Sequence, residues 1–380
     1  MSREFRAIPF YNFFPDVNNL SCDLSVISTK ILVRGGIFLK HQIIVVGCGS
    51  MANTWIDYVL QRDSAEIVAF VDVHLETASA MAASKHLQVP VYSDLGEALA
   101  AHQHVNLVFD VTIPAAHKQI VSTALQANCH VFGEKPMAES MKDARELLDI
   151  SRDTGFTYTV MQNRRYNKQI RALRSILANN EIGHINSIHA DFFLGPHFGG
   201  FREAMDSPLI LDMAIHTFDQ ARYVTNADPV SVYCHEYNPS SSWYEGNASA
   251  SCIFEMSNGV VFTYQGSWSA EGLNTSWESD WRVIGSKGTA KWDGFHLPFY
   301  EVVDETKPTE FLRSVIRKEA KDTYSGHEGH WGCLDEMFSA LEQNRKAETD
   351  CEDNIKSMAM VFAAIESART GKKVFIEDIC

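Results

Sequence analysis

The chain has 380 residues, of which 45% are hydrophobic and 21% charged, as is typical of an ordinary soluble globular protein. Its formal net charge of −15 argues against non-specific binding to nucleic acid or to an anionic membrane surface. No apolar run reaches the roughly 18 residues that a membrane-spanning helix needs, and the eight cysteines form no C-x-x-C pair. We therefore expect a cytoplasmic protein with reduced thiols, and with neither a nucleic-acid nor a membrane partner.

Residues 1–40 are rich in aromatics but show no clear periodicity, and they lack the features of a secretory signal. We treat them as an extension of undefined role. From residue 41 to residue 162, short apolar runs alternate with segments of helical spacing. The runs are "QIIVV", "EIVAFVD", "VPVY", "VNLVFDV", "HVFGEKP" and "TYTVMQN". Apolar strands that alternate with helices predict a parallel sheet covered on both faces, which is the architecture of a Rossmann dinucleotide-binding domain.

The pattern changes over residues 163–380. A helical segment, "NKQIRALRSILANNEIG", ends near Gly183 and is followed by stretches of alternating apolar and polar residues. "SNG" and "GSKG" are hairpin turn signals. One helix, "SPLILDMAIHTFDQARYV", interrupts the strands, and the tail from His330 is helical. This predicts an α+β domain with a large, mainly antiparallel open sheet, whose last helices can pack back on the first domain.

The glycine motif "GCGSMA" lies between a predicted strand and a predicted helix. Gly47 allows the tight turn, Gly49 lets a pyrophosphate approach the backbone, and Ala52 permits close packing of helix on strand. Asp72 ends the second strand about twenty residues later, where a carboxylate holds ribose hydroxyls and repels a 2′-phosphate. NAD is therefore favoured over NADP. The alternative is a glycine turn in another α/β fold.

Two further motifs indicate that the protein is an enzyme. "GEKP" places Lys135 at the end of the fifth strand, beside a bound nicotinamide, and Pro136 can take a cis bond there. In "LDMAIHTFD", Asp212 and His216 are four residues apart, with Asp219 one turn further. His216 can exchange a proton with a substrate hydroxyl while a carboxylate orients it. The alternatives are a surface turn, a core histidine, or a metal pair that lacks a third ligand.

The segment "MQNRRYNK" closes the sixth strand with a polar cluster, Asn163 to Tyr166, where substrate hydroxyls can bind. Its alternative is a solvated domain junction. In the loop "GPHFGGFREAM", Arg202 is a candidate for binding a carboxylate or a sugar hydroxyl, or else a surface arginine.

These motifs, in this order, resemble those of the glucose–fructose oxidoreductase, inositol dehydrogenase and MocA-type oxidoreductases. The matching segments are "GCGSMA", Asp72, "TIPAAH", "EKP", "QNRRY" and the D-x-x-x-H of Asp212 and His216. The resemblance runs from about Gln42 to the C-terminus. It implies hydride transfer between nicotinamide and a carbinol or keto carbon of a sugar, cyclitol or related polyol. It also implies a homodimer or homotetramer formed through the C-terminal sheet. The sequence departs from the family's pattern at "DSPLIL", where a glycine run is common.

The resemblance and the motifs together give the candidate site residues, with no metal ligands among them. The expected catalytic residues are Lys135, Asp212 and His216. The expected cofactor-binding residues are Gly47, Gly49, Ser50, Met51, Ala52, Asp72, Thr112, Pro114, His117, Glu134 and Lys135. The expected substrate-binding residues are Lys135, Asn163, Arg164, Tyr166, Arg202, Asp212 and His216.

Two other functions fit the same sequence. One is a glycosidase that oxidises and later re-reduces a ring carbon with NAD. The other is a nucleotide-binding regulatory protein without turnover. The sequence leaves open the substrate, the physiological direction and the oligomer size.

Overall fold

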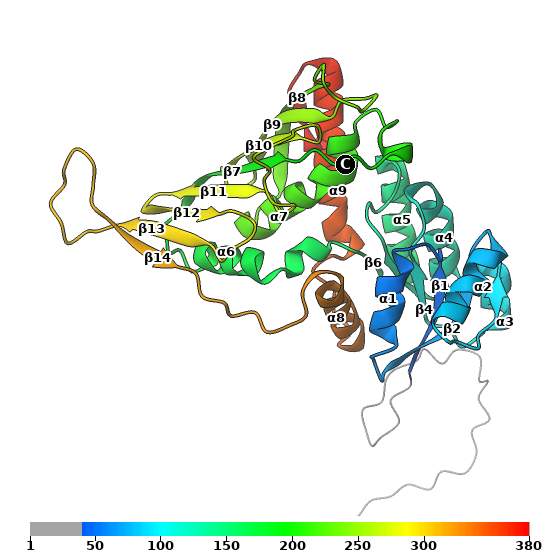
Figure 1. The fold of residues 1–380 in the computed structure, drawn as a ribbon. Helices are drawn as coiled ribbons and strands as arrows, with labels where there is room; N and C mark the ends of the chain where they lie inside the picture. Colours follow the sequence, from blue (N-terminus) through cyan, green and yellow to red (C-terminus); the bar gives the residue numbers. More distant parts are fainter. Residues whose placement is uncertain (1–39, 380) are drawn as a thin grey trace, which may run out of the picture. The chain divides into compact units, whose positions relative to one another are not determined.

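The computed structural model describes residues 40–379, so the predicted extension lies outside the described part except for Lys40. Two sheets organise this part of the chain (Figure 1). No helix within residues 40–379 is long and apolar enough to cross a membrane.

The first sheet has six parallel strands in the order β3-β2-β1-β4-β5-β6. The strands are β1 (His41–Val46), β2 (Ala65–Val71), β3 (Val91–Tyr92), β4 (Leu107–Asp110), β5 (His130–Gly133) and β6 (Tyr158–Val160). Side chains of a strand alternate between the two faces, and both faces are buried here. The six predicted strands and the Rossmann architecture are confirmed.

Helices cover both faces of this sheet, as expected for parallel strands. Ile43 and Val45 pack in one apolar cluster with α1 (Ala52–Val59) and α2 (Leu75–Ser84). Ile44 and Val46 pack in the other cluster, which includes residues of the next three helices. These are α3 (Leu95–Ala101), α4 (Pro114–Gln126) and α5 (Met141–Thr154).

The second sheet has nine strands in the order β14-β13-β12-β11-β7-β10-β9-β8-β15. Only β7 and β10 pair in parallel, so the prediction of a mainly antiparallel sheet is confirmed. The strands are β7 (Ile185–Phe193), β8 (Pro229–Tyr237), β9 (Ser249–Met256), β10 (Val261–Ser267), β11 (Asp280–Gly285), β12 (Gly288–Trp292), β13 (Phe299–Val303), β14 (Val315–Glu319) and β15 (Val374–Phe375).

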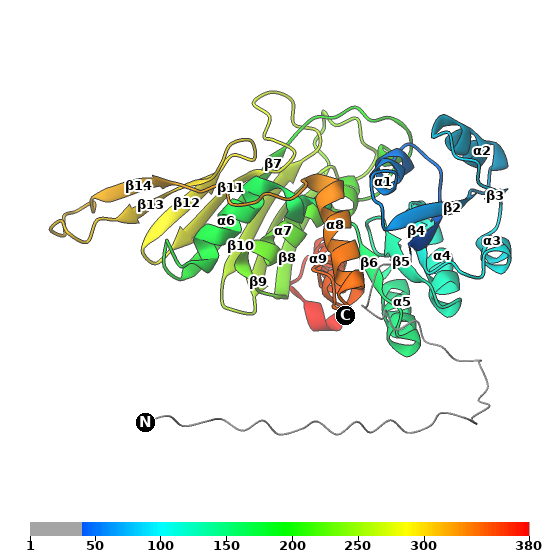
Figure 2. The same ribbon diagram turned by 90° about the horizontal axis from the view of Figure 1, so that it is seen from below.

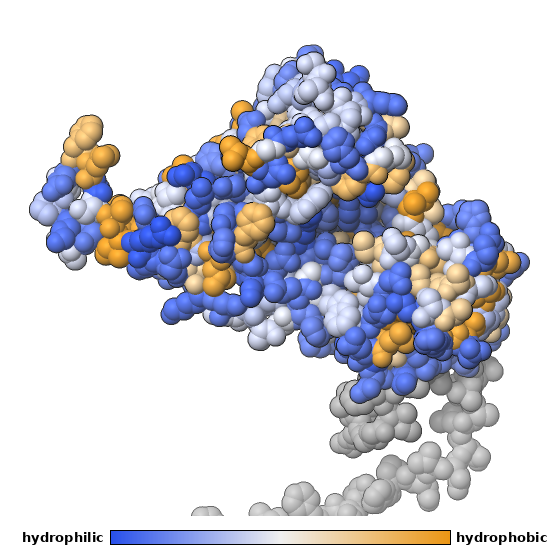
Figure 3. Space-filling view, viewed as in Figure 1, coloured by the Kyte–Doolittle hydropathy of each residue, from blue (hydrophilic) through white to orange (hydrophobic). Residues whose placement is uncertain are grey.

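Within residues 40–379, helices cover one face of the second sheet and leave the other open (Figure 2). The covering helices are α6 (Lys168–Ala178), α7 (Ile215–Thr225) and α9 (Cys351–Thr370). On the open face, Tyr233 and Ile253 lie opposite each other and are about half exposed. The β13–β14 hairpin extends beyond the helices, and apolar side chains gather at its tip, among them Phe311 and Leu312 (Figure 3).

Two details of the helices differ from or refine the prediction. The helix predicted to end near Gly183 ends at Ala178, because Asn180 takes a left-handed conformation with φ 57°. Near the C-terminus, α8 (Gly329–Glu342) packs on α1 of the first sheet. The Trp331 indole donates to the Thr54 carbonyl at 3.2 Å, and the Tyr58 hydroxyl donates to Asp335 at 2.8 Å.

Candidate active site

The glycine loop between β1 and α1 has the geometry of a dinucleotide-binding turn. Gly47 has φ +86°, and a Cβ atom there would come within 2.7 Å of the Val111 carbonyl oxygen. A Cβ on Gly49 would meet no atom of residues 40–379 within 4 Å, so nothing in this part of the chain fills the space above it. The first turn of α1 carries no acidic side chain that would repel an anion, although the N–H groups of Ala52 to Thr54 already donate to main-chain carbonyls of the preceding loop. The loop therefore fits a pyrophosphate.

Asp72 follows β2 and lies against this loop. Its carboxylate accepts a hydrogen bond from the Cys48 N–H at 2.9 Å and a second from the His74 N–H at 2.9 Å. It thus ties the glycine loop to the end of β2, and it remains partly exposed. This is the position of a ribose-binding acid.

The other predicted cofactor-binding residues also lie just after the carboxyl ends of the parallel strands. Gly49, Ser50 and Met51 are exposed ahead of α1, whereas Ala52 is fully buried, as its packing role requires. Thr112 and Pro114 begin the segment after β4, and Glu134 and Lys135 follow β5. The carboxyl ends of parallel strands are where open α/β sheets bind ligands.

His117 is the exception among these residues. Its side chain is completely buried, and its Nδ1 lies 2.7 Å from the carboxylate of Asp110, which is also completely buried. The same carboxylate accepts a hydrogen bond from the Thr112 hydroxyl at 2.5 Å. The structure therefore does not support a cofactor contact by His117. It supports an indirect role, in which Asp110 and His117 hold the loop that carries Thr112.

Lys135 and Asp212 come together although Lys135 follows β5 of the first sheet and Asp212 lies on the helical segment before α7. The Lys135 ammonium donates to the Asp212 main-chain oxygen at 2.9 Å and to its carboxylate at 3.0 Å. The Lys135–Pro136 peptide bond is cis, as expected from the motif. Arg202 donates to the other oxygen of Asp212 at 2.7 Å. Burial raises the pKa of Asp212, but Lys135 and Arg202 outweigh it and hold this pKa below its usual value. Asp212 is therefore a carboxylate clamped between two cations.

His216 lies near these groups, but no carboxylate in the described part of the chain orients it. Its Nδ1 is buried and has no hydrogen-bond partner among residues 40–379. The expected partners are engaged elsewhere, Asp212 with Lys135 and Asp219 with Arg165. The segment Leu209–Ala214 is a π-helix, whose wider turn changes the i,i+4 relation on which the expectation rested.

Burial is the main cause that lowers the pKa of His216 well below its ordinary value. The positive charges of Arg164 and Lys135 and the nearby His330 lower it further. His216 is therefore neutral at pH 7. A neutral imidazole can accept a proton.

The segment after β6 forms a 3₁₀ turn, Asn163–Tyr166, that divides its side chains between two sides. Asn163 and Arg164 face the candidate site. Asn163 lies 3.3 Å from His330, and Arg164 pairs with Glu278 at 3.3 Å and also binds the Trp277 carbonyl.

Tyr166 points the other way and is buried in the apolar cluster beside α8. Its hydroxyl is buried and has no hydrogen-bond partner within the described residues. The predicted substrate contact by Tyr166 is therefore not supported, because tertiary packing encloses the ring.

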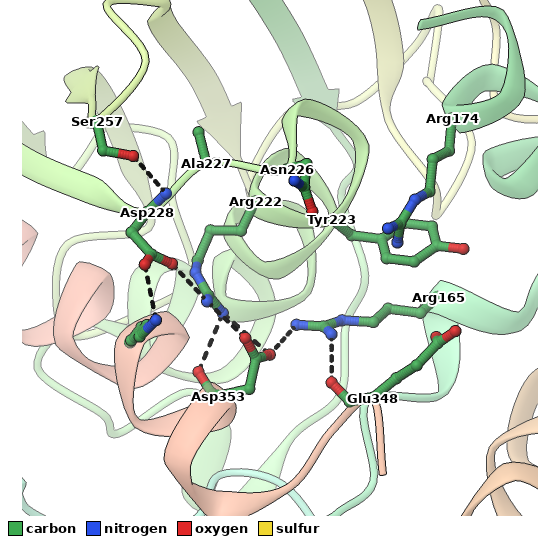
Figure 4. A pocket seen from close by; sticks show the side chains of 11 residues that line it. Arg165, Arg174, Arg222, Tyr223, Asn226, Ala227, Asp228, Ser257, Glu348 and Asp353 are labelled. Atoms are coloured by element: carbon green, nitrogen blue, oxygen red, sulfur yellow. Dashed lines mark hydrogen bonds and ion pairs between the residues drawn. The ribbon is translucent and has the colours of Figure 1, made fainter. Parts of the chain in front are cut away.

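Arg165 also turns away from Lys135, into a polar cavity of about 420 Å³ beside the end of α7 (Figure 4). There Arg165 pairs with Asp219 and Asp353, and Arg222 pairs with Asp228 and Asp353. Each of these carboxylates is matched by a cation, so we interpret the cavity as a structural ion-pair network.

His330 and Glu134 join the site through contacts that sequence motifs do not reveal. Glu134 accepts a hydrogen bond from the Trp55 indole at 2.9 Å, and His330 lies 3.9 Å from the same oxygen. The pKa of His330 is lowered by burial, against the attraction of Glu134. His330 lies next to the start of α8, and no motif of the sequence marks it as a site residue.

Comparison with known proteins assigns the chain to a family. Residues 41–162 match the model of an oxidoreductase family with an NAD-binding Rossmann fold, and residues 170–291 match the GFO/IDH/MocA C-terminal domain. The chain belongs to the GFO/IDH/MocA oxidoreductase family. NAD as the cofactor, predicted from the glycine motif, is confirmed by this membership.

Some relatives of this chain carry names that refer to sugars or inositol. The chain is 25% identical over 343 residues to the 1,5-anhydro-D-fructose reductase of Ensifer adhaerens, covering 88% of this chain and 98% of that protein. It is 29% identical over 192 residues to an inositol 2-dehydrogenase/D-chiro-inositol 3-dehydrogenase of Lacticaseibacillus casei, covering 50% and 54%. A solved oxidoreductase from Agrobacterium radiobacter, in complex with NAD+, L-tartaric acid and magnesium, shares the fold, with a TM-score of 0.78. It is 20% identical, and the match covers 90% of this chain and all of that one.

Proposed function

We propose that the protein is an NAD-dependent dehydrogenase that transfers a hydride between nicotinamide and a carbinol or keto carbon of a sugar, cyclitol or related polyol. The observation that carries the proposal is the Lys135–Asp212 contact at 3.0 Å, made next to a neutral His216 and at the ligand-binding end of the NAD-binding sheet. The names of the curated relatives support the substrate class.

In this proposal His216 is the base for oxidation of a hydroxyl. Its neutral imidazole takes the hydroxyl proton as the carbonyl forms, and the protonated form returns it in the reverse direction. NAD, when bound, accepts the hydride. Burial, together with Arg164, Lys135 and His330, lowers the pKa of His216 and so also makes its protonated form a strong acid for the reverse reaction.

Lys135 is proposed to donate a hydrogen bond to the substrate oxygen and to stabilise negative charge on it. Its contact with Asp212 sets the position of the ammonium group. Arg202 holds the other oxygen of Asp212, so we assign it a positioning role in place of the direct substrate contact predicted from sequence. Asn163 and Arg164 are proposed to bind further substrate hydroxyls.

Selectivity for NAD over NADP is proposed to rest on Asp72. Its carboxylate stands at the end of β2, where it would accept hydrogen bonds from ribose hydroxyls and repel a 2′-phosphate.

The test is a screen of sugars, cyclitols and sugar acids with NAD and with NADP. The reaction is monitored by the absorbance of the reduced cofactor. The expected result is stoichiometric NADH formation with at least one polyol. The Lys135→Ala variant should bind NAD normally and lose about 100-fold or more in kcat. Lys142→Ala, at a lysine on α5 whose side chain is 79% exposed, is the matched control.

Two results would contradict the proposal. A Lys135→Ala protein with wild-type turnover would remove Lys135 from catalysis. Cleavage of a glycoside with no net NADH would favour the transient-oxidation glycosidase instead.

A further inference from the structure

Three aromatic rings stand exposed on two loops next to the candidate active site. Phe198 and Phe201 lie on the connection from β7 to the Asp212 helix, and Trp277 lies on the connection from β10 to β11. Their exposed fractions are 43%, 68% and 44%. A single exposed apolar residue is ordinary, but grouped aromatic surface marks a binding site.

Direct contacts connect the first two rings to Asp212. The Arg202 guanidinium lies 5.1 Å from the centre of the Phe198 ring and 4.8 Å from that of Phe201. The same guanidinium donates to Asp212 at 2.7 Å, and Asp212 contacts Lys135. The two phenyl rings are thus one arginine side chain away from the proposed catalytic groups.

Trp277 approaches the site from the other loop. Its carbonyl binds Arg164, whose guanidinium also lies 3.7 Å from the Met213 sulfur. The Trp277 ring centre is 6.3 Å from that of Phe198, so the two loops bring their rings together.

The first loop is anchored at its base. The Trp243 indole and the Tyr244 hydroxyl both donate to the Pro196 carbonyl, at 3.2 and 2.8 Å. His197 stacks on Trp243 with ring centres 3.8 Å apart. The aromatic rings are therefore presented on a fixed support, which lowers the entropy cost of using them for binding.

We propose that Phe198, Phe201 and Trp277 form a stacking subsite for a second ring of the substrate, so that the substrate class is a glycoside with a cyclic aglycone. This inference rests on the proposed function. The first sugar ring has to reach Lys135 and His216. A ring stacked on Phe198 and Phe201 lies beyond Arg202 and is therefore a different ring, and Trp277 borders it through Phe198. Aromatic faces stack on the apolar face of an aryl group or of a second pyranose, while the neighbouring polar groups bind hydroxyls.

The experiment measures binding by titration calorimetry on the full-length protein saturated with NADH. The probes are methyl D-glucopyranoside, phenyl D-glucopyranoside and a glucose disaccharide, each as both anomers, and the same series is repeated for galactose, mannose and xylose. In at least one series, a ligand with a second ring should bind about tenfold more tightly than the methyl glycoside, which corresponds to about 1.4 kcal/mol. Whether the phenyl glycoside or the disaccharide gains more identifies the aglycone.

The variants are Phe201→Ala, whose side chain is mostly exposed, and Trp277→Ala, which keeps the carbonyl that binds Arg164. Each should reduce the preference for the second ring to less than about threefold, because part of the stacking surface is lost. Phe311→Ala, at an exposed phenylalanine on the β13–β14 hairpin, is the matched control and should keep the preference.

The outcomes separate this inference from the proposed function. Equal binding of methyl and two-ring glycosides in every series, or no binding at all, overturns the subsite. A change in oligomer mass in Phe201→Ala, measured by light scattering, also overturns it and assigns the rings to a subunit contact. A preference that depends on the aromatic rings, without NADH formation from any substrate, supports the subsite and contradicts the dehydrogenase proposal.

Discussion

Glu236 on β8 offers a test of how burial acts on stability in this fold. One of its carboxylate oxygens accepts a hydrogen bond from the Ser207 hydroxyl at 3.1 Å. The other is buried without a hydrogen-bond partner in residues 40–379. Burial raises the pKa of Glu236 from 4.5 to about 7. Ser207 directly precedes the helical segment that carries Asp212.

The sign and size of the effect follow from this pKa. The folded state binds the proton more tightly than the unfolded state, so this stabilisation is fully present below pH 4.5 and is lost as pH rises through about 7. At about 1.4 kcal/mol per pKa unit, the difference between 7 and 4.5 sets an upper limit of about 3 kcal/mol. Glu236 is only partly buried, and solvent screening reduces the expected value to about 1–2 kcal/mol.

Glu236→Gln removes the titration and keeps the shape of the side chain. We expect the variant to match the wild type near pH 4.5 and to be about 1–2 kcal/mol more stable at pH 8, as measured by urea denaturation. Glu245→Gln, at an exposed glutamate of the following loop, is the control, and its free energy of unfolding should equal that of the wild type at both pH values. A variant that is equally or less stable than the wild type at pH 8 would refute the reasoning.

Three further predictions concern the site. Gly47→Ala forces a side chain into a left-handed conformation within 2.7 Å of the Val111 carbonyl, so it should lower the free energy of unfolding by about 1–3 kcal/mol and weaken NAD binding, as measured by denaturation and calorimetry. Asp72→Ala should raise KM for NAD about tenfold and reduce the preference over NADP, and an unchanged cofactor ratio in steady-state kinetics would contradict this. Because the pKa of His216 lies well below 6.5, polyol oxidation should keep its rate as pH falls from 8 to 6.5, and His216→Ala should lower kcat about 100-fold or more.

The sequence alone predicts most of the fold of residues 41–379. Strands such as "QIIVV" and helices such as α5 are predicted from the spacing of apolar residues within each segment. Turns such as "SNG" are predicted from a few adjacent residues, so none of these predictions needs information from distant parts of the chain. Gly47 was predictable because its positive φ is a backbone requirement that glycine satisfies without strain.

The candidate site was predictable in part. The ends of parallel strands share one edge, so the positions of Gly49, Asp72 and Lys135 in the sequence are enough to group them. The orientation of individual side chains was not predictable, because it depends on what packs against each element. Tyr166 and His117 have polar groups and were expected to contact a ligand, yet tertiary packing buries both side chains.

The sequence by itself determined the two sheets and the glycine loop, and it predicted that Lys135, Asp212 and His216 belong to one site. Only the tertiary structure decided that Arg202 clamps Asp212, that His330 lies against Asn163 from 167 residues away, and that no carboxylate of residues 40–379 orients His216. The physical reason is that a periodic pattern records which face of an element is buried. The partner of a polar group is set by long-range packing, to which residues distant in the chain contribute.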